Sequence, residues 1–177
     1  WRWAFMLAAS CGFYMAFIPA YILILAGTIG IDYWAAIRIE ASSGARRRAW
    51  LVASIVSTCA VLFVFKYFNF FVDSFATTLE AFGFRHVPTS TLRILLPPGI
   101  SFYTFQEVAY IVDVYRRKIE PANSLVEYAL FISLFPHLIA GPIVRHNELI
   151  PQFDGDPLRA GSDQRIGMGL ILFTIGF

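Results

Sequence analysis

A long apolar run near the start of the chain, from Trp3 to Ile37, limits what this sequence can fold into. A helix rises about 1.5 Å per residue, so one helix over the whole run is longer than the roughly 30 Å hydrocarbon core of a bilayer. Pro19 lies near the middle of the run, and a proline inside a helix breaks the hydrogen-bond ladder. We therefore expect two membrane helices, at about residues 2–17 and 19–39.

The composition also indicates a membrane protein. Of the 177 residues, 58% are hydrophobic and 15% are charged, whereas a soluble domain carries about 25% charged residues. The net charge of +2 and the absence of a basic stripe argue against nucleic-acid binding. Cys11 and Cys59 lie inside apolar runs without metal-ligand spacing, so we expect neither a disulfide nor a metal site. The expected fold class is all-α, a polytopic transmembrane helical bundle with broken or re-entrant helices.

Apolar stretches and helix breakers predict the remaining elements. Pro97, Pro98 and Gly99 stop and restart the chain, and Pro136 interrupts a later apolar stretch, as does the Gly141-Pro142 pair. Besides the first two, the expected helices are 49–72, 100–115, 125–144 and one that starts near 166. We expect 73–93 to be a loop with an amphipathic piece suited to the membrane surface. Neither end has the features of a natural terminus, so we expect residues 1–177 to form a single membrane domain truncated at both ends.

Basic residues near the helix ends predict the orientation. If the helices alternate across the bilayer, one side collects Arg2, Arg38, Arg46, Arg47, Arg48, Arg116, Arg117 and Lys118. The opposite loop holds Arg85 and Arg93. Because cytoplasmic loops are enriched in Lys and Arg, we expect the larger group to lie in the cytoplasm. The side on which segment 145–165 lies is left open by this argument.

Polar groups recur on one face of the expected helix 100–115. The spacings of 3, 4 and 3 connect Tyr103, Gln106, Tyr110 and Asp113. Glu107 lies beside this face, and because hydrocarbon disfavours carboxylates, the face must point into the bundle. Two interpretations stay open: the groups line a polar pathway, or they satisfy one another as packing groups. Lys66, near the end of the preceding helix, is expected either to snorkel or to pair with a carboxylate such as Glu107.

His137 is the candidate for proton transfer. It follows Pro136 between helix breakers, where freed carbonyl groups must face protein or a water-lined cavity. A histidine with a pKa of about 6.5 can act as a base. The alternative is a histidine that hydrogen-bonds to the loosened backbone and shapes the break. Arg145 is expected near the same broken helix, and we interpret His86 and His146 as surface residues in polar loops.

Three blocks of this sequence carry a resemblance to a known family. They read "FKYFNFFVDSF", "LPPGISFYTFQEVAYIVDVYRRKIEP" and "FISLFPHLIAGPIVRHNELIPQF", in this order. Together they resemble the membrane-bound O-acyltransferase (MBOAT) family, in particular its alginate O-acetylation type. The resemblance covers nearly the whole chain and implies a partial MBOAT fold.

The resemblance implies an activity, a donor and partners. An acyl group, here an acetyl group, would pass from a cytoplasmic donor such as acetyl-CoA through a membrane tunnel to an extracytoplasmic polysaccharide. A second, extracytoplasmic acetyltransferase or a polysaccharide-synthesis complex would be the partner, and the membrane would be the bacterial inner membrane. No bound cofactor is implied. Two alternatives stay open: D-alanyl transfer to teichoic acid, and a transporter or channel subunit whose intramembrane carboxylates bind an ion.

The resemblance also implies which residues act. The family's catalytic histidine sits in a Trp-His pair in a later block, and none of Trp1, Trp3, Trp34 and Trp50 is followed by histidine. The catalytic histidine is therefore expected outside this chain, and residues 1–177 alone are expected to be inactive. No catalytic role is transferred to His137. The residues expected to line the tunnel or support it are Lys66, Tyr103, Gln106, Glu107, Tyr110, Asp113, His137 and Arg145.

Overall fold

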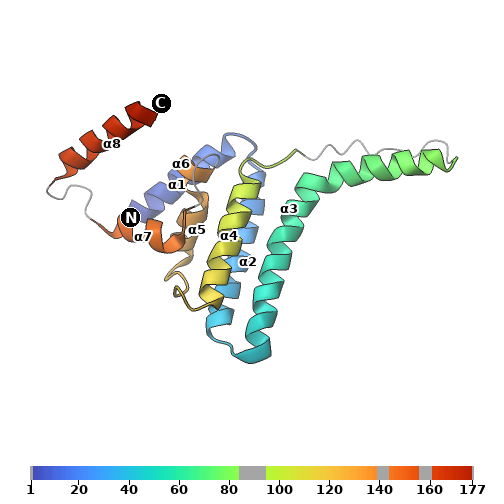
Figure 1. The fold of residues 1–177 in the computed structure, drawn as a ribbon, viewed down its shortest axis with the longest axis horizontal. Coiled ribbons are helices and arrows are strands. Elements are labelled where there is room, and N and C mark those ends of the chain that lie inside the picture. Colours follow the sequence, from blue (N-terminus) through green and yellow to red (C-terminus); the bar gives the residue numbers. More distant parts are fainter. Residues whose placement is uncertain (1, 84–94, 139–143, 156–160, 177) are drawn as a thin grey trace.

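The computed structural model describes residues 2–83, 95–138, 144–155 and 161–176. Over these residues the chain is helical, with turns and no strand, which confirms the all-α class. The helices are α1 (Arg2–Met15), α2 (Tyr21–Glu40), α3 (Gly44–Ala81), α4 (Ile100–Tyr115), α5 (Leu125–Ser133), α6 (Phe135–Leu138), α7 (His146–Asp154) and α8 (Ser162–Gly176). Figure 1 shows α2, α4 and the first part of α3 side by side.

The first apolar run is broken where the sequence places its proline. Helix α1 ends at Met15 and α2 begins at Tyr21, with Pro19 in the turn between them. The turn closes with a 3.0 Å hydrogen bond from the backbone N–H of Tyr21 to the carbonyl of Ile18. Because α1 has only 14 residues, it is shorter than the roughly 20 residues that an upright span needs.

Helix α2 is the centre of the bundle. It packs against α3, α4 and α5, and Ala35 and Ala36 are buried there. Small side chains let membrane helices approach closely. Two helices among the described residues, α2 and α3, are long and apolar enough to cross a membrane by length and composition. Large apolar side chains such as Leu23 and Phe63 are exposed on their outer faces, as lipid contact requires.

Helix α3 is longer than the sequence analysis predicts. We expected a helix over 49–72 followed by a loop, but α3 is helical from Gly44 to Ala81. The expected loop was wrong over 73–81 because no proline or glycine interrupts those residues, and the chain first turns at Gly83, where φ is 91°. Figure 1 shows that α3 bends and that its last part leaves the bundle. Residues 84–94, which include Arg85, His86 and Arg93, lie outside the described part of the chain.

Gly99 positions the start of α4. Its φ of 74° is left-handed, a conformation that favours glycine, and α4 begins at the next residue. A Cβ atom at this position would collide with the backbone carbonyl oxygen of Leu138. The expected restart after the proline pair therefore has two causes, a turn and a close approach between α4 and α6.

The last third of the described chain consists of short helices. The expected helix 125–144 breaks at Leu134, so that α5 and α6 are separate, while Gly141 and Pro142 lie outside the described residues. Helix α7 lies in the segment for which we predicted no element, and it contains Pro151. Helix α8 begins at Ser162, four residues before the expected start. Figure 1 shows α8 apart from the bundle.

Candidate functional site

The inward face of α4 is the starting point of the candidate site. Its polar side chains Tyr103, Gln106, Glu107 and Tyr110 are each at most 2% exposed. They face a bundle interior formed by α2, α3 and α5, which pack against α4. The structure thus buries the polar stripe read from the sequence, whereas its role in lining a tunnel stays a prediction.

Asp32 of α2 faces the same interior, and the sequence analysis missed it. It is 1% exposed, and its carboxylate accepts hydrogen bonds from the hydroxyls of Ser54 and Thr58 on α3, the latter at 3.1 Å. The spacing of Ser54 and Thr58 puts both hydroxyls on one face of α3. The sequence shows Asp32 as a single acid in an apolar helix, and Ser54 and Thr58 as two hydroxyls in the next helix. Nothing in the sequence indicates that α2 and α3 face each other at these residues.

Glu107 is the most isolated of the buried polar groups. It is fully buried, and its carboxylate has only the Thr28 hydroxyl of α2 as a hydrogen-bonding neighbour among the described residues. Asp32 of α2 is its electrostatic neighbour. The hydroxyls of Tyr103 and Tyr128 interact with Glu107 electrostatically, and the Tyr103 hydroxyl also interacts with that of Tyr14. Four helices, α2 to α5, therefore contribute to one buried polar cluster, which we call the inner polar cluster: Thr28, Asp32, Ser54, Thr58, Tyr103, Glu107, Tyr110 and Tyr128.

Two expected members lie elsewhere. Asp113 is at the end of α4, where its carboxylate is 3.9 Å from the Nζ atom of Lys118 across the helix-terminal turn. Lys66 is exposed, with its Nζ atom 5.7 Å from the ring centroid of Tyr67, so the expected pair with Glu107 is not formed. The pair fails because α3 turns Lys66 to the outer surface of the bundle.

The other two expected residues are His137 and Arg145. The backbone of His137 is part of α6, and its side chain lies outside the described part of the structure. Arg145 is exposed and precedes the first residue of α7 with extended backbone, without a side-chain cap. The structure therefore does not place Arg145 in the inner polar cluster.

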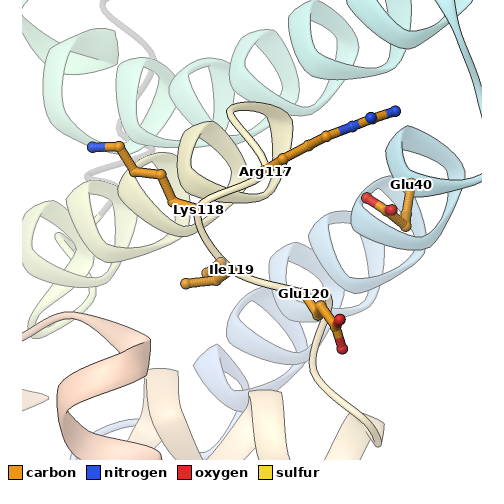
Figure 2. A pocket seen from close by; sticks show the side chains of 5 residues that line it. All are labelled: Glu40, Arg117, Lys118, Ile119 and Glu120. Carbon is orange, nitrogen blue, oxygen red and sulfur yellow. The ribbon is translucent and has the colours of Figure 1, made fainter.

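The basic residues at the ends of α2, α3 and α4 gather at one end of the bundle. Arg47 is buried there, and its Nη2 atom donates to the carbonyl oxygens of Val114 at 3.2 Å and Tyr115 at 3.0 Å. The same guanidinium lies 3.9 Å from the carboxylate of Glu40. A hollow of about 410 Å³ opens beside them, and Figure 2 shows its lining residues Glu40, Arg117, Lys118, Ile119 and Glu120. Because acids and bases both line the hollow, it carries no strong preference for one charge.

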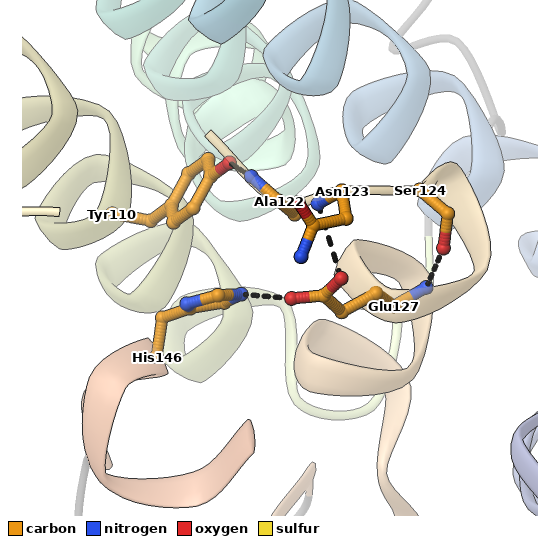
Figure 3. Close-up of polar contacts among 6 residues, drawn as sticks. All are labelled: Tyr110, Ala122, Asn123, Ser124, Glu127 and His146. Carbon is orange, nitrogen blue, oxygen red and sulfur yellow. Dashed lines mark hydrogen bonds and ion pairs between the residues drawn. The ribbon is translucent and has the colours of Figure 1, made fainter. Parts of the chain in front are cut away.

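The turn between α4 and α5 is a network of caps. The hydroxyl of Tyr110 accepts a 2.8 Å hydrogen bond from the backbone N–H of Ala122, as Figure 3 shows. Ser124 caps α5 by accepting from the backbone N–H of Glu127 at 3.1 Å. The Glu127 carboxylate in return accepts from the backbone N–H of Asn123 at 3.0 Å, which is the reciprocal capping pattern.

His146 completes this network, and the interpretation of it as a surface residue was wrong. Its side chain is 10% exposed, and its ring centroid lies 5.3 Å from that of Tyr110 and 5.2 Å from that of Phe131. Burial lowers the pKa of His146 to about 4. The imidazole is therefore neutral at pH 7, so its 3.5 Å approach to the Glu127 carboxylate is not an ion pair at that pH. Apolar residues on the same helix, Leu149, Ile150 and Phe153, carried the signal that α7 packs on the bundle.

The chemistry of the site follows from its composition. Among the described residues no group of three or more His, Cys, Asp or Glu side chains is arranged to hold a metal ion. The inner polar cluster offers carboxylate and hydroxyl oxygens without a basic side chain. Such a cluster can bind polar groups or cations and can line a pathway through an apolar bundle.

Similar proteins define the class of this chain. It is 40% identical over 175 residues to the probable alginate O-acetylase AlgI of Pseudomonas aeruginosa, which covers 97% of this chain and 32% of that protein. It is 39% identical over 174 residues to the corresponding protein of Azotobacter vinelandii, with 97% and 34% covered. It is also 32% identical over 196 residues to the peptidoglycan O-acetyltransferase of Helicobacter pylori, with 97% and 36% covered. No family model and no solved structure matches the chain.

These similarities identify the chain as a homologue of bacterial O-acetylases. It spans about a third of the length of the curated relatives it matches. The resemblance to MBOAT proteins of the alginate O-acetylation type is confirmed at this level.

Proposed function

We propose that the chain is part of a membrane-bound O-acetyltransferase that modifies an extracytoplasmic polysaccharide of the bacterial envelope. The acetyl group would come from a cytoplasmic donor, for which acetyl-CoA is the natural candidate. The acceptor would be the polysaccharide itself or a partner acetyltransferase on the far side of the inner membrane. The observation that carries the proposal is the similarity along 97% of the chain to alginate and peptidoglycan O-acetylases.

The geometry supports this proposal in two ways. The basic residues at one end of the bundle fit a cytoplasmic face, from which the donor would arrive. The inner polar cluster extends polar groups from α2 to α5 inside an otherwise apolar bundle. In the intact protein a histidine base beyond these residues would activate the acceptor hydroxyl, and the polar interior would stabilise charge at the thioester carbonyl.

The proposal is tested by genetic complementation. Deletion of the gene should remove acetyl esters from an envelope polysaccharide, measured by alkaline release of acetate from purified material, and the complete protein should restore them. Residues 1–177 alone should restore none, because general acid–base help is typically worth about 10²–10⁴-fold. If the deletion removes D-alanine esters and leaves acetyl esters unchanged, the acetyl proposal is wrong.

His137 is examined in the same strains. We expect the complete protein with His137→Ala to keep more acetylation than a variant without the histidine of the expected Trp-His pair. The expected reason is that His137 acts through the geometry of the break between α5 and α6. Equal loss in the two variants would give His137 the catalytic role.

A further inference from the structure

Two carboxylates lie inside the bundle, and this chain alone encloses them. Asp32 is 1% exposed and Glu107 is fully buried, with helices α2, α3, α4 and α5 around them. The two carboxylates interact electrostatically. Two like charges in an apolar interior are costly unless a counter-charge neutralises them. Enclosed acids are neutralised either by protonation or by a cation within the same cluster. Asp32 accepts a hydroxyl hydrogen bond at each of its two oxygens, which favours its charged form.

The basic side chains of the described residues do not supply the counter-charge. Arg47 is the buried one, and it is bound to the end of α4 and to Glu40. The exposed ones are Arg2, Arg38, Arg46, Arg48, Lys66, Arg116, Arg117, Lys118, Arg145 and Arg165. The neutral imidazole of His146 faces Glu127 and two aromatic rings.

The groups around the carboxylates are oxygen atoms. Ser54 and Thr58 of α3 donate to Asp32, and the hydroxyl of Thr28 lies beside Glu107 and donates to the carbonyl oxygen of Leu25 at 3.1 Å. The titratable groups that face the pair are phenols: Tyr103, Tyr110 and Tyr128. Among the described residues, the Glu107 carboxylate has the Thr28 hydroxyl as its hydrogen-bonding neighbour and no basic side chain. A fully buried carboxylate surrounded by oxygen atoms and without a paired base is suited to bind a positively charged ligand.

We propose that Asp32 and Glu107, together with the hydroxyls of Thr28, Ser54 and Thr58, form an intramembrane binding site for one Na⁺ ion. Hard cations take oxygen ligands, and membrane proteins use buried carboxylates and hydroxyls to hold Na⁺. Occupancy joins α2 and α4 by bridging their carboxylates, and α3 contributes through its two hydroxyls. This site is independent of the O-acetyltransferase proposal.

The test measures how the stability of the complete protein depends on cations. The protein is purified in detergent, and its thermal midpoint is measured at pH 8 while NaCl replaces choline chloride at constant ionic strength. A bound ion stabilises the folded state, so the midpoint should rise with Na⁺ and saturate, by about 5 °C at a hundredfold excess over the dissociation constant. In a second series without Na⁺, the pH is varied from 8 to 5 to test whether protonation alone neutralises the two acids.

Matched variants locate the effect. Glu107→Gln and Asp32→Asn keep the side-chain shapes and remove the charges, so each should lose the cation dependence. Asp113→Asn on the same helix should keep it, because Asp113 lies beside Lys118 at the end of α4, outside the inner polar cluster. If a variant fails to fold, equilibrium binding of radioactive Na⁺ to the wild-type protein, with one bound ion displaced by acid, carries the test.

Each outcome either supports or overturns the proposed binding site. Saturable Na⁺ stabilisation that disappears in Glu107→Gln and Asp32→Asn supports the site with Na⁺ as the ligand. Stabilisation on acidification without any Na⁺ effect, lost in the same variants, shows that protonation alone neutralises the two acids and overturns the proposal. A wild-type protein that responds to neither, or a response that both variants retain, overturns the proposal.

Discussion

At the scale of single residues, burial distinguishes the polar groups of the inner polar cluster from those at the ends of helices. Glu107 and Asp113 lie on one helix and both are acids, yet the first is fully buried and the second lies beside Lys118 at the end of the helix. Helical spacing put Asp113 on the polar face and Glu107 beside it, and spacing alone carries no information on where the helix leaves the bundle. The stripe over 103–110 could therefore be predicted from the sequence, and its end could not.

Asp32 shows a different limit. An isolated acid in an apolar helix has no periodic partner in its own segment, so its role depends on which helix lies opposite. Its partners Ser54 and Thr58 are more than twenty residues away on α3. The sequence contains all three residues, but their contact depends on the packing of α2 against α3.

Gly99→Ala is predicted to destabilise the protein. Alanine at a φ of 74° costs at least about 1 kcal/mol, and its Cβ atom would collide with the carbonyl oxygen of Leu138. Gly27→Ala is the control, because a Cβ atom at Gly27 meets nothing within 4 Å. The free energy of unfolding in detergent should fall in the first variant and stay unchanged or rise in the second. Equal stability of the two variants would show that α4 and α6 do not approach closely.

At the scale of helices, proline and glycine predicted the helix ends well where these residues are present. Pro19 separates α1 from α2, and Gly99 marks the start of α4. The end of α3 lies beyond the predicted end because the change from apolar to amphipathic sequence does not stop a helix where no proline or glycine is present. Helix α7 was missed because His146 was interpreted as part of a polar loop, whereas the apolar residues of α7 pack on the bundle.

Arg47→Met is predicted to weaken the contact between α3 and α4. The guanidinium binds two carbonyl oxygens at the end of α4, and hydrogen bonds to a charged group are worth about 1.5–3 kcal/mol. The free energy of unfolding should fall by roughly that amount. Arg46→Met, at an exposed position next in sequence, is the matched control and should leave stability nearly unchanged. A large loss in the control would indicate a general effect of charge.

His146 predicts an acid-sensitive contact between α5 and α7. Its folded-state pKa of about 4 lies below the unfolded value of 6.5, so the unfolded chain binds more protons between these values. Stability should therefore fall as the pH drops from about 6.5 to 4, by at most about 3 kcal/mol, since one pKa unit corresponds to about 1.4 kcal/mol.

The control for this pH dependence is His146→Gln, measured by detergent unfolding at pH 7, 5.5 and 4. The variant should lose that part of the pH dependence. Glu127, 3.5 Å away, attracts a protonated imidazole and so opposes the effect of burial. Higher stability of the wild-type protein at pH 5 than at pH 7, absent in the variant, would show that this attraction outweighs burial.

At the scale of the whole molecule, the described chain is a bundle with one basic end and a polar interior. Cysteine labelling tests the predicted orientation in a background with Cys11→Ser and Cys59→Ser. Ser43→Cys and Asn123→Cys, both at exposed turn positions, should resist a membrane-impermeant maleimide in intact cells, whereas Ser90→Cys should react. Labelling of the first two from outside would reverse the orientation and remove the support for a cytoplasmic donor site.

The central claim is that the polar interior of this bundle serves O-acetyl transfer. The direct measurement is the acetyl ester content of the envelope polysaccharide in a deletion strain that carries the complete protein with Glu107→Leu, Asp113→Leu or Val108→Leu, at equal amounts in the membrane. We predict that Glu107→Leu loses most of the acetyl esters, because it removes a fully buried carboxylate, while the other two variants stay near wild type. Wild-type acetylation with Glu107→Leu would contradict the account.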